Sequence, residues 1–424
     1  MTDYKGIVEL RQFLNGVKRD RIKTRYEYYD MKNITKYLKG AIPEQLRWMH
    51  SVLGWCSKSV DALENRLVFR EFDNDRFNMN AIFQMNNSDI LFSSAILSAL
   101  ICSCSFIFIE PDADGQPTLR AVDGGDATGT FDNQTYMLTE GYAVLERDDK
   151  TRLPIREIYT VAGRTDYYER GRLVSSIANK LPYAALVPIV YRPDIVRPFG
   201  HSRISRASMS YTQGALRTLM RSEICAEFYA FPQKYILGLS PDADELDNWK
   251  ASIASILRID KDEDGDKPTV GQFNTSSMTP YLDQLKTFAS LMAGEASLTM
   301  DDLGFSSTNP SSSEAIKAAH ENLRLTARKA QRSFGTGFLN AGYLAACMRD
   351  DYQYKRNEIY GAKALWEPIF EPDMSALSLI GDGVIKINQA VPGYIDKKNL
   401  RNLTGIDAEV NNDRSVRINP TVVE

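Results

Sequence analysis

The 424-residue sequence predicts a protein of the α+β class, in which helices and antiparallel strands occupy separate stretches of the chain. Apolar residues recur at helical spacing up to about residue 100 and again from about residue 203 onward. Between these stretches, residues 103–192 carry short β-prone runs separated by polar turns. Hydrophobic residues make up 43% of the chain and charged residues 25%, which is typical of a globular protein and argues against the disordered and fibrous classes.

The first hundred residues are expected to be mainly helical. Ile7, Leu10 and Leu14 recur at helical spacing, so one face of this segment is apolar. A second helix is expected from Pro43 to Trp55, because proline is well suited to the first turn of a helix.

The segment 90–109, ILFSSAILSALICSCSFIFI, is long enough to span a bilayer. It contains five serines and ends in a run of aromatic and β-branched residues. These features favour a buried helix that runs into a buried strand. A membrane-anchored scaffold held through this segment is the weaker alternative.

Residues 103–192 are expected to form a β-rich antiparallel insert. Polar turns at Asp112–Gly115, Asp148–Lys150 and Glu169–Gly171 separate its β-prone runs. Helices are expected again in the second half of the chain, where residues 203–230 have one apolar face and Pro232 ends the pattern.

The segment 231–278 has a β-α-β pattern, with a helix expected at about 244–257 and an acidic loop after it. Another helix begins at Pro280, and a polar loop follows through residues 299–312. A long helix is then expected from Ser311 to about Met348. Its start is indicated by Ser311 and Glu314, which have the spacing of a capping box.

The charge balance and the cysteine content exclude some classes of function. With 51 Lys and Arg against 55 Asp and Glu, the chain is too acidic to coat nucleic acid by bulk charge. Five scattered cysteines do not suggest a disulfide framework, so free thiols in a reducing compartment are expected.

Motifs for catalysis and cofactor binding are missing from the sequence. It contains neither a GxxxxGK[ST] phosphate loop nor a GxGxxG turn, which argues against nucleotide hydrolysis and dinucleotide binding. Asp260, Asp262 and Asp264 imitate half of a calcium loop, but Gly271 stands where the bidentate Glu is needed. We therefore expect no metal site, no cofactor and no enzymatic activity.

A hydrolase remains the rival hypothesis. The run 200–203, GHSR, resembles half of a nucleophile elbow, although Ile204 replaces the second glycine. Ser202 is expected to cap the following helix. The alternative is a monomeric mixed α/β hydrolase that uses Ser202 and His201.

The order of these elements resembles the portal proteins of tailed bacteriophages, of the siphophage type. The run FGHSRIS leads through a long helix into EFYAFPQKYILG, and TRYEYYDMKNI with VDALENRL is similar to the family's N-terminal wing. The stretches PYLDQLKTFASLMAGEASL, DDLGFSSTNPSSSEAIKAAHENL and RKAQRSF follow in the family's order. The resemblance covers about residues 10–405.

This resemblance implies a portal fold with the following parts. They are a wing at 1–202 (helical to about 100, β-rich over 103–192), stem helices at 203–230 and 279–298, a small α/β clip at 231–278, a tunnel loop at 299–312, a long spine helix at 313–348, and a wing return with a short crown or C-terminal tail at 349–424.

The resemblance also implies a function and partners. Identical subunits, expected to be twelve, form a ring at one capsid vertex, and its channel passes double-stranded DNA during packaging and ejection. Implied partners are the terminase large subunit, a head-to-tail adaptor, and the major capsid and scaffolding proteins, with no membrane. Such a ring is assembled in the host cytoplasm and resides in the virion.

Three groups of residues are candidates for sites. The tunnel loop would line the channel with polar groups that hold a polyanion weakly, or it is an ordinary surface loop; its candidates are Asp301, Asp302, Thr308, Asn309, Ser311, Ser312 and Ser313. An acidic clip surface would dock the packaging motor and the adaptor, or it is a solvated loop; its candidates are Asp242, Asp244, Glu245, Asp260, Asp262, Glu263 and Asp264. A basic stripe on the long helix would contact the next subunit, or it is the solvated side of the helix; its candidates are Lys317, Arg324, Arg328 and Arg332.

Overall fold

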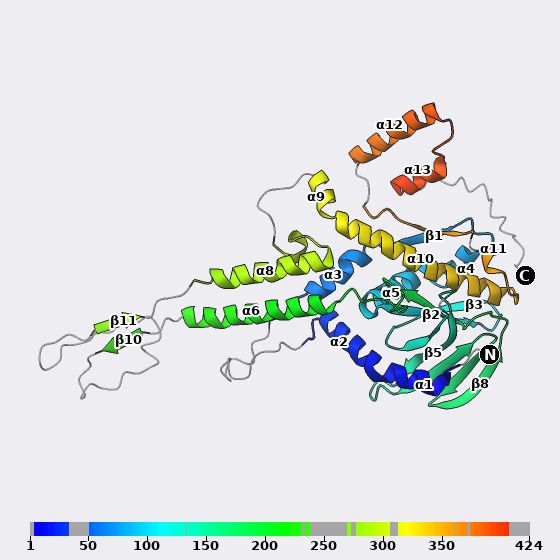
Figure 1. Cartoon of the computed structure of the whole chain (residues 1–424), viewed down its shortest axis with the longest axis horizontal. Helices are drawn as coiled ribbons and strands as arrows, with labels where there is room; N and C mark the ends of the chain where they lie inside the picture. Colours follow the sequence, from blue (N-terminus) through cyan, green and yellow to red (C-terminus); the bar gives the residue numbers. More distant parts are fainter. Residues whose placement is uncertain are drawn as a thin grey trace, which may run out of the picture. The chain divides into compact units, whose positions relative to one another are not determined.

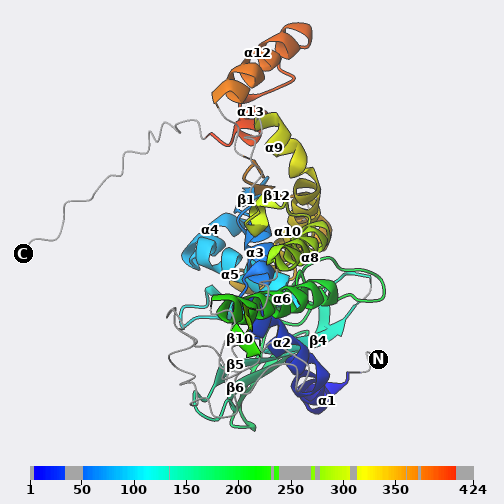
Figure 2. The ribbon, with the colours of Figure 1, turned by 90° about the vertical axis from the view of Figure 1, so that its left-hand side faces the viewer.

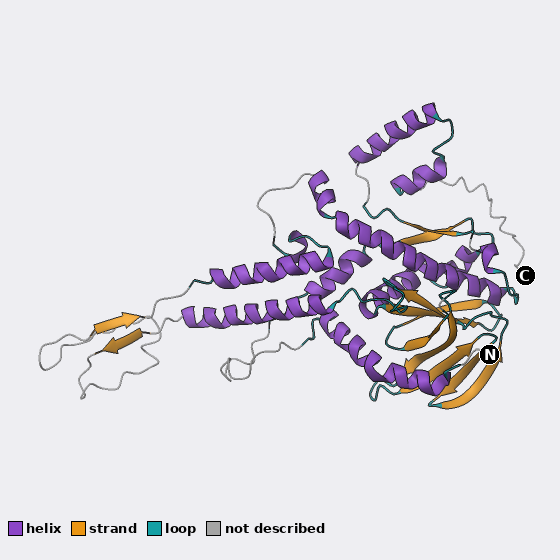
Figure 3. Cartoon of the chain, in the orientation of Figure 1, coloured by secondary structure: helices purple, strands orange, loops and turns teal. Residues whose placement is uncertain are grey.

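The computed structural model describes residues 4–33, 51–132, 134–230, 234–237, 269–272, 277–305, 313–359, 361–370 and 374–406. The chain divides into two units. The β-rich unit comprises Met1–Asn15, Ala62–His201 and Arg324–Glu424, and the helical unit comprises Gly16–Asp61 and Ser202–Leu323. Helices and strands are largely segregated along the chain, which confirms the predicted α+β class (Figure 3).

Two antiparallel sheets form the predicted insert. In the first, β2 (Cys104–Pro111) lies between β3 (Pro117–Val122) and β9 (Leu186–Val190). The second has the order β4-β5-β6-β7-β8, and its strands are β4 (Ala127–Phe131), β5 (Leu138–Arg147), β6 (Pro154–Val161), β7 (Arg164–Glu169) and β8 (Arg172–Ala178). The tight β7–β8 turn has φ of 46° at Arg170 and 81° at Gly171, and positive φ at both central residues is what a type I′ hairpin turn requires.

The apolar stretch near residue 100 is a buried helix followed by a buried strand, as predicted. Helix α5 (Ser88–Cys102) ends at Ser103, and β2 begins one residue later with its first six side chains buried. Within the described part of the chain, no single helix is long and apolar enough to cross a membrane. Helix α4 (Met79–Met85) and α5 reach that length and composition only together, and they are bent by 87°.

An aromatic core joins distant segments of the β-rich unit. Strand β1 (Phe69–Asp73) pairs antiparallel with β12 (Lys363–Trp366). The ring of Phe69 lies 4.3 Å from that of Phe92, 5.5 Å from that of Phe338 and 5.4 Å from that of Trp366 (centroid distances). Phe338 belongs to α10 (Glu321–Arg349), so this cluster holds α10, α5 and the β1–β12 pair together.

Helix α1 (Gly6–Phe13) lies on the five-stranded sheet (Figure 2). Leu10 and Leu14 are buried against Tyr142 and Val144 of β5. The predicted apolar face of the first helix is thus its contact with the sheet. Further elements of the chain are α2 (Arg19–Tyr29), α3 (Trp55–Glu64), α11 (Arg356–Ile359), α12 (Met374–Ala390) and α13 (Lys397–Thr404).

Two long helices of the helical unit run side by side (Figure 1). They are α6 (Arg206–Ala230) and α8 (Thr279–Ala296). Strands β10 (Lys234–Leu237) and β11 (Thr269–Gln272) pair antiparallel. The helix expected at about 244–257 lies outside the described residues.

Three local predictions are corrected by the structure. Helix α6 begins at Arg206 and is capped by Ser205, whose hydroxyl accepts the N–H of Ser208 at 3.1 Å; Ser202 is not the cap. The helix expected from Pro43 to Trp55 is corrected only over residues 51–54, which are not helical; α3 begins at Trp55, and residues 34–50 lie outside the described residues.

The long helix expected over residues 313–348 is interrupted at His320. It forms α9 (Ser313–Ala319) and α10. No glycine or proline occurs between residues 313 and 334, so the sequence offers no breaker there. The break coincides with a tertiary contact, in which Nδ1 of His320 lies 3.7 Å from Oδ2 of Asp302.

Candidate functional site

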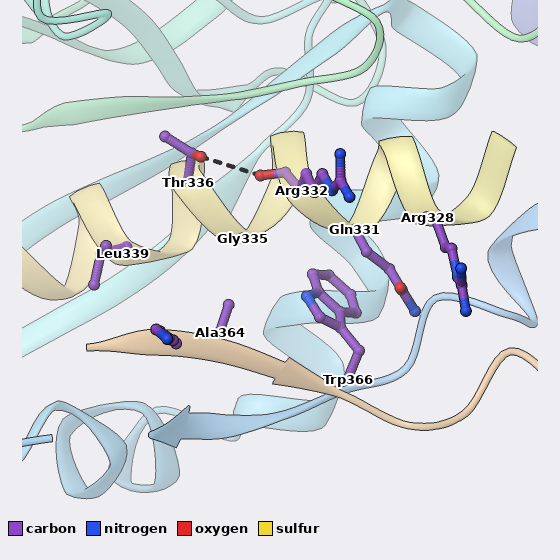
Figure 4. A pocket seen from close by; sticks show the side chains of 9 residues that line it. Arg328, Gln331, Arg332, Gly335, Thr336, Leu339, Ala364 and Trp366 are labelled. Atoms are coloured by element: carbon purple, nitrogen blue, oxygen red, sulfur yellow. Dashed lines mark hydrogen bonds between the residues drawn. The ribbon is translucent and has the colours of Figure 1, made fainter. Parts of the chain in front are cut away.

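A groove of about 480 Å³ lies between α10 and β12 in the β-rich unit (Figure 4). We call it the basic groove. Its lining residues are Arg328, Gln331, Arg332, Gly335, Thr336, Leu339, Lys363, Ala364 and Trp366.

The helix and the strand approach each other closely at the floor of the basic groove. A Cβ atom on Gly335 would lie 2.9 Å from Cβ of Ala364, so glycine is needed for this approach. Pairing with β1 holds the strand in place, since Ala364 is opposite Phe72 and Lys363 is opposite Asp73. The register of this pair therefore brings Lys363 to the groove.

Positive charge gathers in the basic groove. Arg328 and Arg332 are four residues apart on α10 and so share one helical face, where both are exposed. Lys363 adds a third cation from β12, and none of the described lining residues carries a carboxylate. Among the described residues, none of these three side chains has an ion-pair partner.

The remaining lining residues add a hydrogen-bond donor and an apolar wall. The Nε2 atom of Gln331 is shielded from solvent and has no acceptor in the part of the chain that the structure describes. Trp366 and Leu339 supply apolar surface beside the cations (Figure 4). Arginine guanidinium groups bind carboxylates and phosphates in a planar, two-pronged geometry, so this lining suits an anion that carries an apolar neighbour.

The four residues of the predicted basic stripe therefore do not all lie in one site. Arg328 and Arg332 line the basic groove, whereas Lys317 lies on the separate helix α9 and Arg324 is half-buried outside the lining. Sequence reasoning missed Lys363 and Trp366. The short run ALW before Pro368 is compatible with a strand, but it carries no signal that this strand pairs with β1.

Helices α6 and α8 form an antiparallel hairpin in the helical unit. The ring of Phe288 occupies the space left by Gly214, where an added Cβ would lie 2.5 Å from the ring. Farther along, Oγ1 of Thr218 donates to Oε1 of Gln284 at 3.1 Å. Sγ of Cys225 lies 3.0 Å from the hydroxyl of Tyr281, so the pairing continues toward the end of α6.

Arg203 anchors the other end of this hairpin. Its side chain is buried, and its guanidinium donates to the carbonyl oxygens of Ser59 and Ala296. Ala296 is the last residue of α8, where carbonyl groups lack partners within the helix. A cation at this position also interacts favourably with the helix dipole.

The predicted tunnel-loop residues are only partly described. Asp301 and Asp302 lie in the 3-10 helix η3 (Asp301–Leu303). The carboxylate of Asp302 accepts both the N–H and the hydroxyl of Thr299 at 2.9 Å, so it stabilises the local turn. Ser313 opens α9, whereas Thr308, Asn309, Ser311 and Ser312 lie outside the described residues. A channel-lining role for this loop stays a prediction.

The acidic clip candidates also lie outside the described residues. They are Asp242, Asp244, Glu245, Asp260, Asp262, Glu263 and Asp264. Their role as a docking surface stays a prediction.

The hydrolase candidates form other contacts. Nε2 of His201 lies 2.6 Å from Oδ2 of Asp194, and this hydrogen bond lowers the pKa of the Asp194 carboxyl. The hydroxyl of Ser202 accepts the N–H of Ile204 at 3.0 Å. In the described ranges, no cluster of three or more His, Cys, Asp or Glu side chains is arranged to hold a metal ion.

Sequence comparison relates the chain to two curated portal proteins. The portal protein of Mycobacterium phage L5 is 23% identical over 340 residues, which cover 75% of this chain and 69% of that protein. The portal protein of Mycobacterium phage D29 is 23% identical over 346 residues, which cover 76% of this chain and 70% of that protein. No protein-family model matches the chain.

Comparison with solved structures finds chains of gene transfer agent (GTA) particles. A chain of the native virion has a TM-score of 0.44 at 14% identity and covers 91% of this chain and 99% of its own length. A chain from the neck of the empty particle, computed with C6 symmetry, has a TM-score of 0.49 at 13% identity, with coverages of 89% and 98%. A chain from the native neck, computed with C12 symmetry, has a TM-score of 0.45 at 15% identity, with coverages of 83% and 90%.

Proposed function

We propose, from the similarity to two phage portal proteins, that this chain belongs to the phage portal protein family and assembles into a ring of identical subunits around a channel for double-stranded DNA. The ring is expected to contain twelve subunits and to occupy one vertex of the capsid. Members of this family are structural components of the virion and not enzymes, so the hydrolase hypothesis is set aside.

The observation that carries the proposal is the sequence similarity to portal proteins over 75% of the chain. The α6–α8 hairpin supports it physically. Its helices are held together along their length by the Gly214–Phe288 contact, the Thr218–Gln284 hydrogen bond and the Arg203 anchor. A rigid pair of helices in every subunit is a suitable wall for a channel.

We assign the parts of the portal fold to this chain as follows. The wing is formed by residues 1–202, the stem by 203–230 and 279–298, the clip by 231–278, the tunnel loop by 299–312 and the spine helix by 313–348, and residues 349–424 form a wing return with a short crown or C-terminal tail. In this assignment α6 and α8 are the stem, and the antiparallel pair of β10 and β11 belongs to the clip.

The channel must let a polyanion slide. Many contacts between cations and phosphates would bind DNA strongly, with a steep dependence on salt. The tunnel loop contains Asp301, Asp302 and several neutral polar residues, so it repels phosphate or contacts it weakly. The energy for packaging comes from a partner ATPase, the terminase large subunit. This subunit docks on the acidic clip, and the head-to-tail adaptor binds the same surface later. The major capsid and scaffolding proteins are the partners of the wing.

The test is the mass of the purified full-length protein by light scattering, with negative-stain images of the same sample. A particle of about twelve subunits with a central hole is expected. A protein that stays monomeric at every salt concentration, alone and with its capsid and scaffolding proteins, would overturn the proposal.

A further inference from the structure

The basic groove brings positive charge and an unused hydrogen-bond donor to one place. Arg328, Arg332 and Lys363 all line the groove, and no carboxylate of the described chain neutralises them. Like charges gathered in this way repel one another, and an incoming anion relieves that repulsion. The unpaired Nε2 of Gln331 is a further donor that lacks an acceptor.

We infer that the basic groove receives an acidic segment of a neighbouring copy of this chain. A carboxylate of that segment binds between Arg328 and Arg332, and an apolar side chain next to it packs on Trp366 and Leu339. The inference rests on the proposed function, because a neighbouring copy is present only in a ring. It adds to that function the residues that join one subunit to the next.

A ring explains why the two sides of such a contact need not resemble each other. In a ring built by rotation, each subunit offers one surface to its left neighbour and a different surface to its right neighbour. The chain carries 55 acidic residues, so a second copy can supply a carboxylate whose charge complements this groove.

The shape of the groove favours a peptide over DNA. A duplex presents phosphates along an extended backbone and is held by cations spread along a strip of surface. Here the three cations surround one groove of about 480 Å³ whose wall includes an indole ring. This volume lies within the range of pockets that enclose small ligands, and it accommodates a few side chains.

The first experiment compares two charge-reversed proteins with the wild type. One carries Arg328→Glu with Arg332→Glu, and the control carries Lys329→Glu with Lys150→Glu. The control has the same change in charge, but Lys329 and Lys150 are exposed and do not line the groove. Circular dichroism and thermal unfolding establish that each variant folds, and light scattering over a range of protein concentrations measures ring formation.

The groove variant is expected to need at least about tenfold more protein than the wild type for half-maximal assembly, whereas the control assembles as the wild type does. Equal assembly of the groove variant and the wild type would overturn the inference and leave the proposed function intact. A wild type that never assembles would overturn both. If the groove variant fails to fold, Arg328→Gln with Arg332→Gln replaces it, with the same expected direction.

The second experiment identifies what occupies the groove. A photoreactive amino acid replaces the exposed Thr336 at the groove edge, and rings are formed from an equal mixture of isotopically light and heavy chains. Cross-links between light and heavy chains, at a peptide that contains Asp or Glu, are expected. Cross-links confined to one chain would overturn the inference. The inference would also be overturned if the groove variant lost binding to a short DNA duplex while its ring assembly stayed normal.

Discussion

The carboxylate of Glu140 lies at the first turn of α1, where its Oε2 atom accepts the backbone N–H of Gly6 at 3.0 Å. Its Oε1 atom accepts the N–H of Lys5 at the same distance, so a residue of β5 caps a helix that begins more than a hundred residues earlier. Thr130 and Tyr159 donate to the same carboxylate. Negative charge is favourable at a helix N-terminus, so this buried group ties α1 to the sheet.

The Glu140 cap makes stability depend on pH. Burial acts to raise the pKa of Glu140, but the four hydrogen bonds that it accepts outweigh burial and lower it. The folded state therefore binds the proton less readily than the unfolded state. The stability from this carboxylate is present above the unfolded pKa and is lost as pH falls through the folded pKa.

Glu140→Gln should cost about 1–2 kcal/mol of unfolding free energy at neutral pH, the range for a lost helix cap. Its stability should also fall less than that of the wild type between about pH 7 and about pH 3. Urea unfolding across this range measures both effects. Glu146→Gln, an exposed change on the same strand, is the control. Parallel pH curves for Glu140→Gln and the wild type would contradict the assignment.

Arg11 neutralises a second buried carboxylate of the same sheet. Its Nε and Nη2 atoms donate to the two oxygens of Glu157, each at 3.0 Å, and the hydroxyl of Tyr142 also donates to Glu157. Arg11→Ala leaves Glu157 buried with only the tyrosine, and we expect a loss of about 1–3 kcal/mol in unfolding free energy. Urea unfolding measures the loss. Lys23→Ala, an exposed change, should alter stability by less than about 0.5 kcal/mol.

The packing of α6 on α8 depends on the missing side chain of Gly214. Gly214→Ala places a methyl group within 2.5 Å of the Phe288 ring, so we expect a loss of about 1–3 kcal/mol. Gly294→Ala on α8 is the matched control, because nothing lies within 4 Å of its new methyl group. That change should stabilise the protein by up to about 1 kcal/mol through helix propensity. Denaturant unfolding that ranks the two variants in the opposite order would refute this account of the hairpin.

The rate at which each cysteine thiol reacts should show whether its side chain is buried. Burial raises the pKa of Cys56 to about 11, so little thiolate forms at neutral pH, and Cys102, Cys104 and Cys347 are also buried. Only Cys225 is partly exposed. Ellman's reagent at about pH 8 should titrate one thiol rapidly in the native protein and all five after unfolding. Cys225→Ser should abolish the rapid phase, and a rapid phase that persists in this variant would mean that a buried thiol is accessible.

The elements that sequence reasoning located correctly have a strong local signal. The turns at Asp148–Lys150 and Glu169–Gly171 and the β-prone runs between them predicted the antiparallel insert. The serines and the final aromatic run in residues 90–109 predicted α5 and β2. Errors arose where several local choices were equally good. Ser202 and Ser205 are both acceptable caps, and only the course of the chain decides that Ser205 begins the helix.

The sequence by itself determined the α+β class and most helices and strands, because their signals lie within a few turns of one chain segment. It also placed Arg328 and Arg332 on one helical face. Tertiary structure alone decided that Lys363 and Trp366 complete the basic groove, since this depends on the register between β12 and β1, which are far apart in sequence. It likewise decided that Glu140 caps α1 and that the long helix breaks at His320. Hydrogen bonds and charge contacts between residues distant in sequence depend on how the whole chain folds. The spacing of residues within one segment does not predict them.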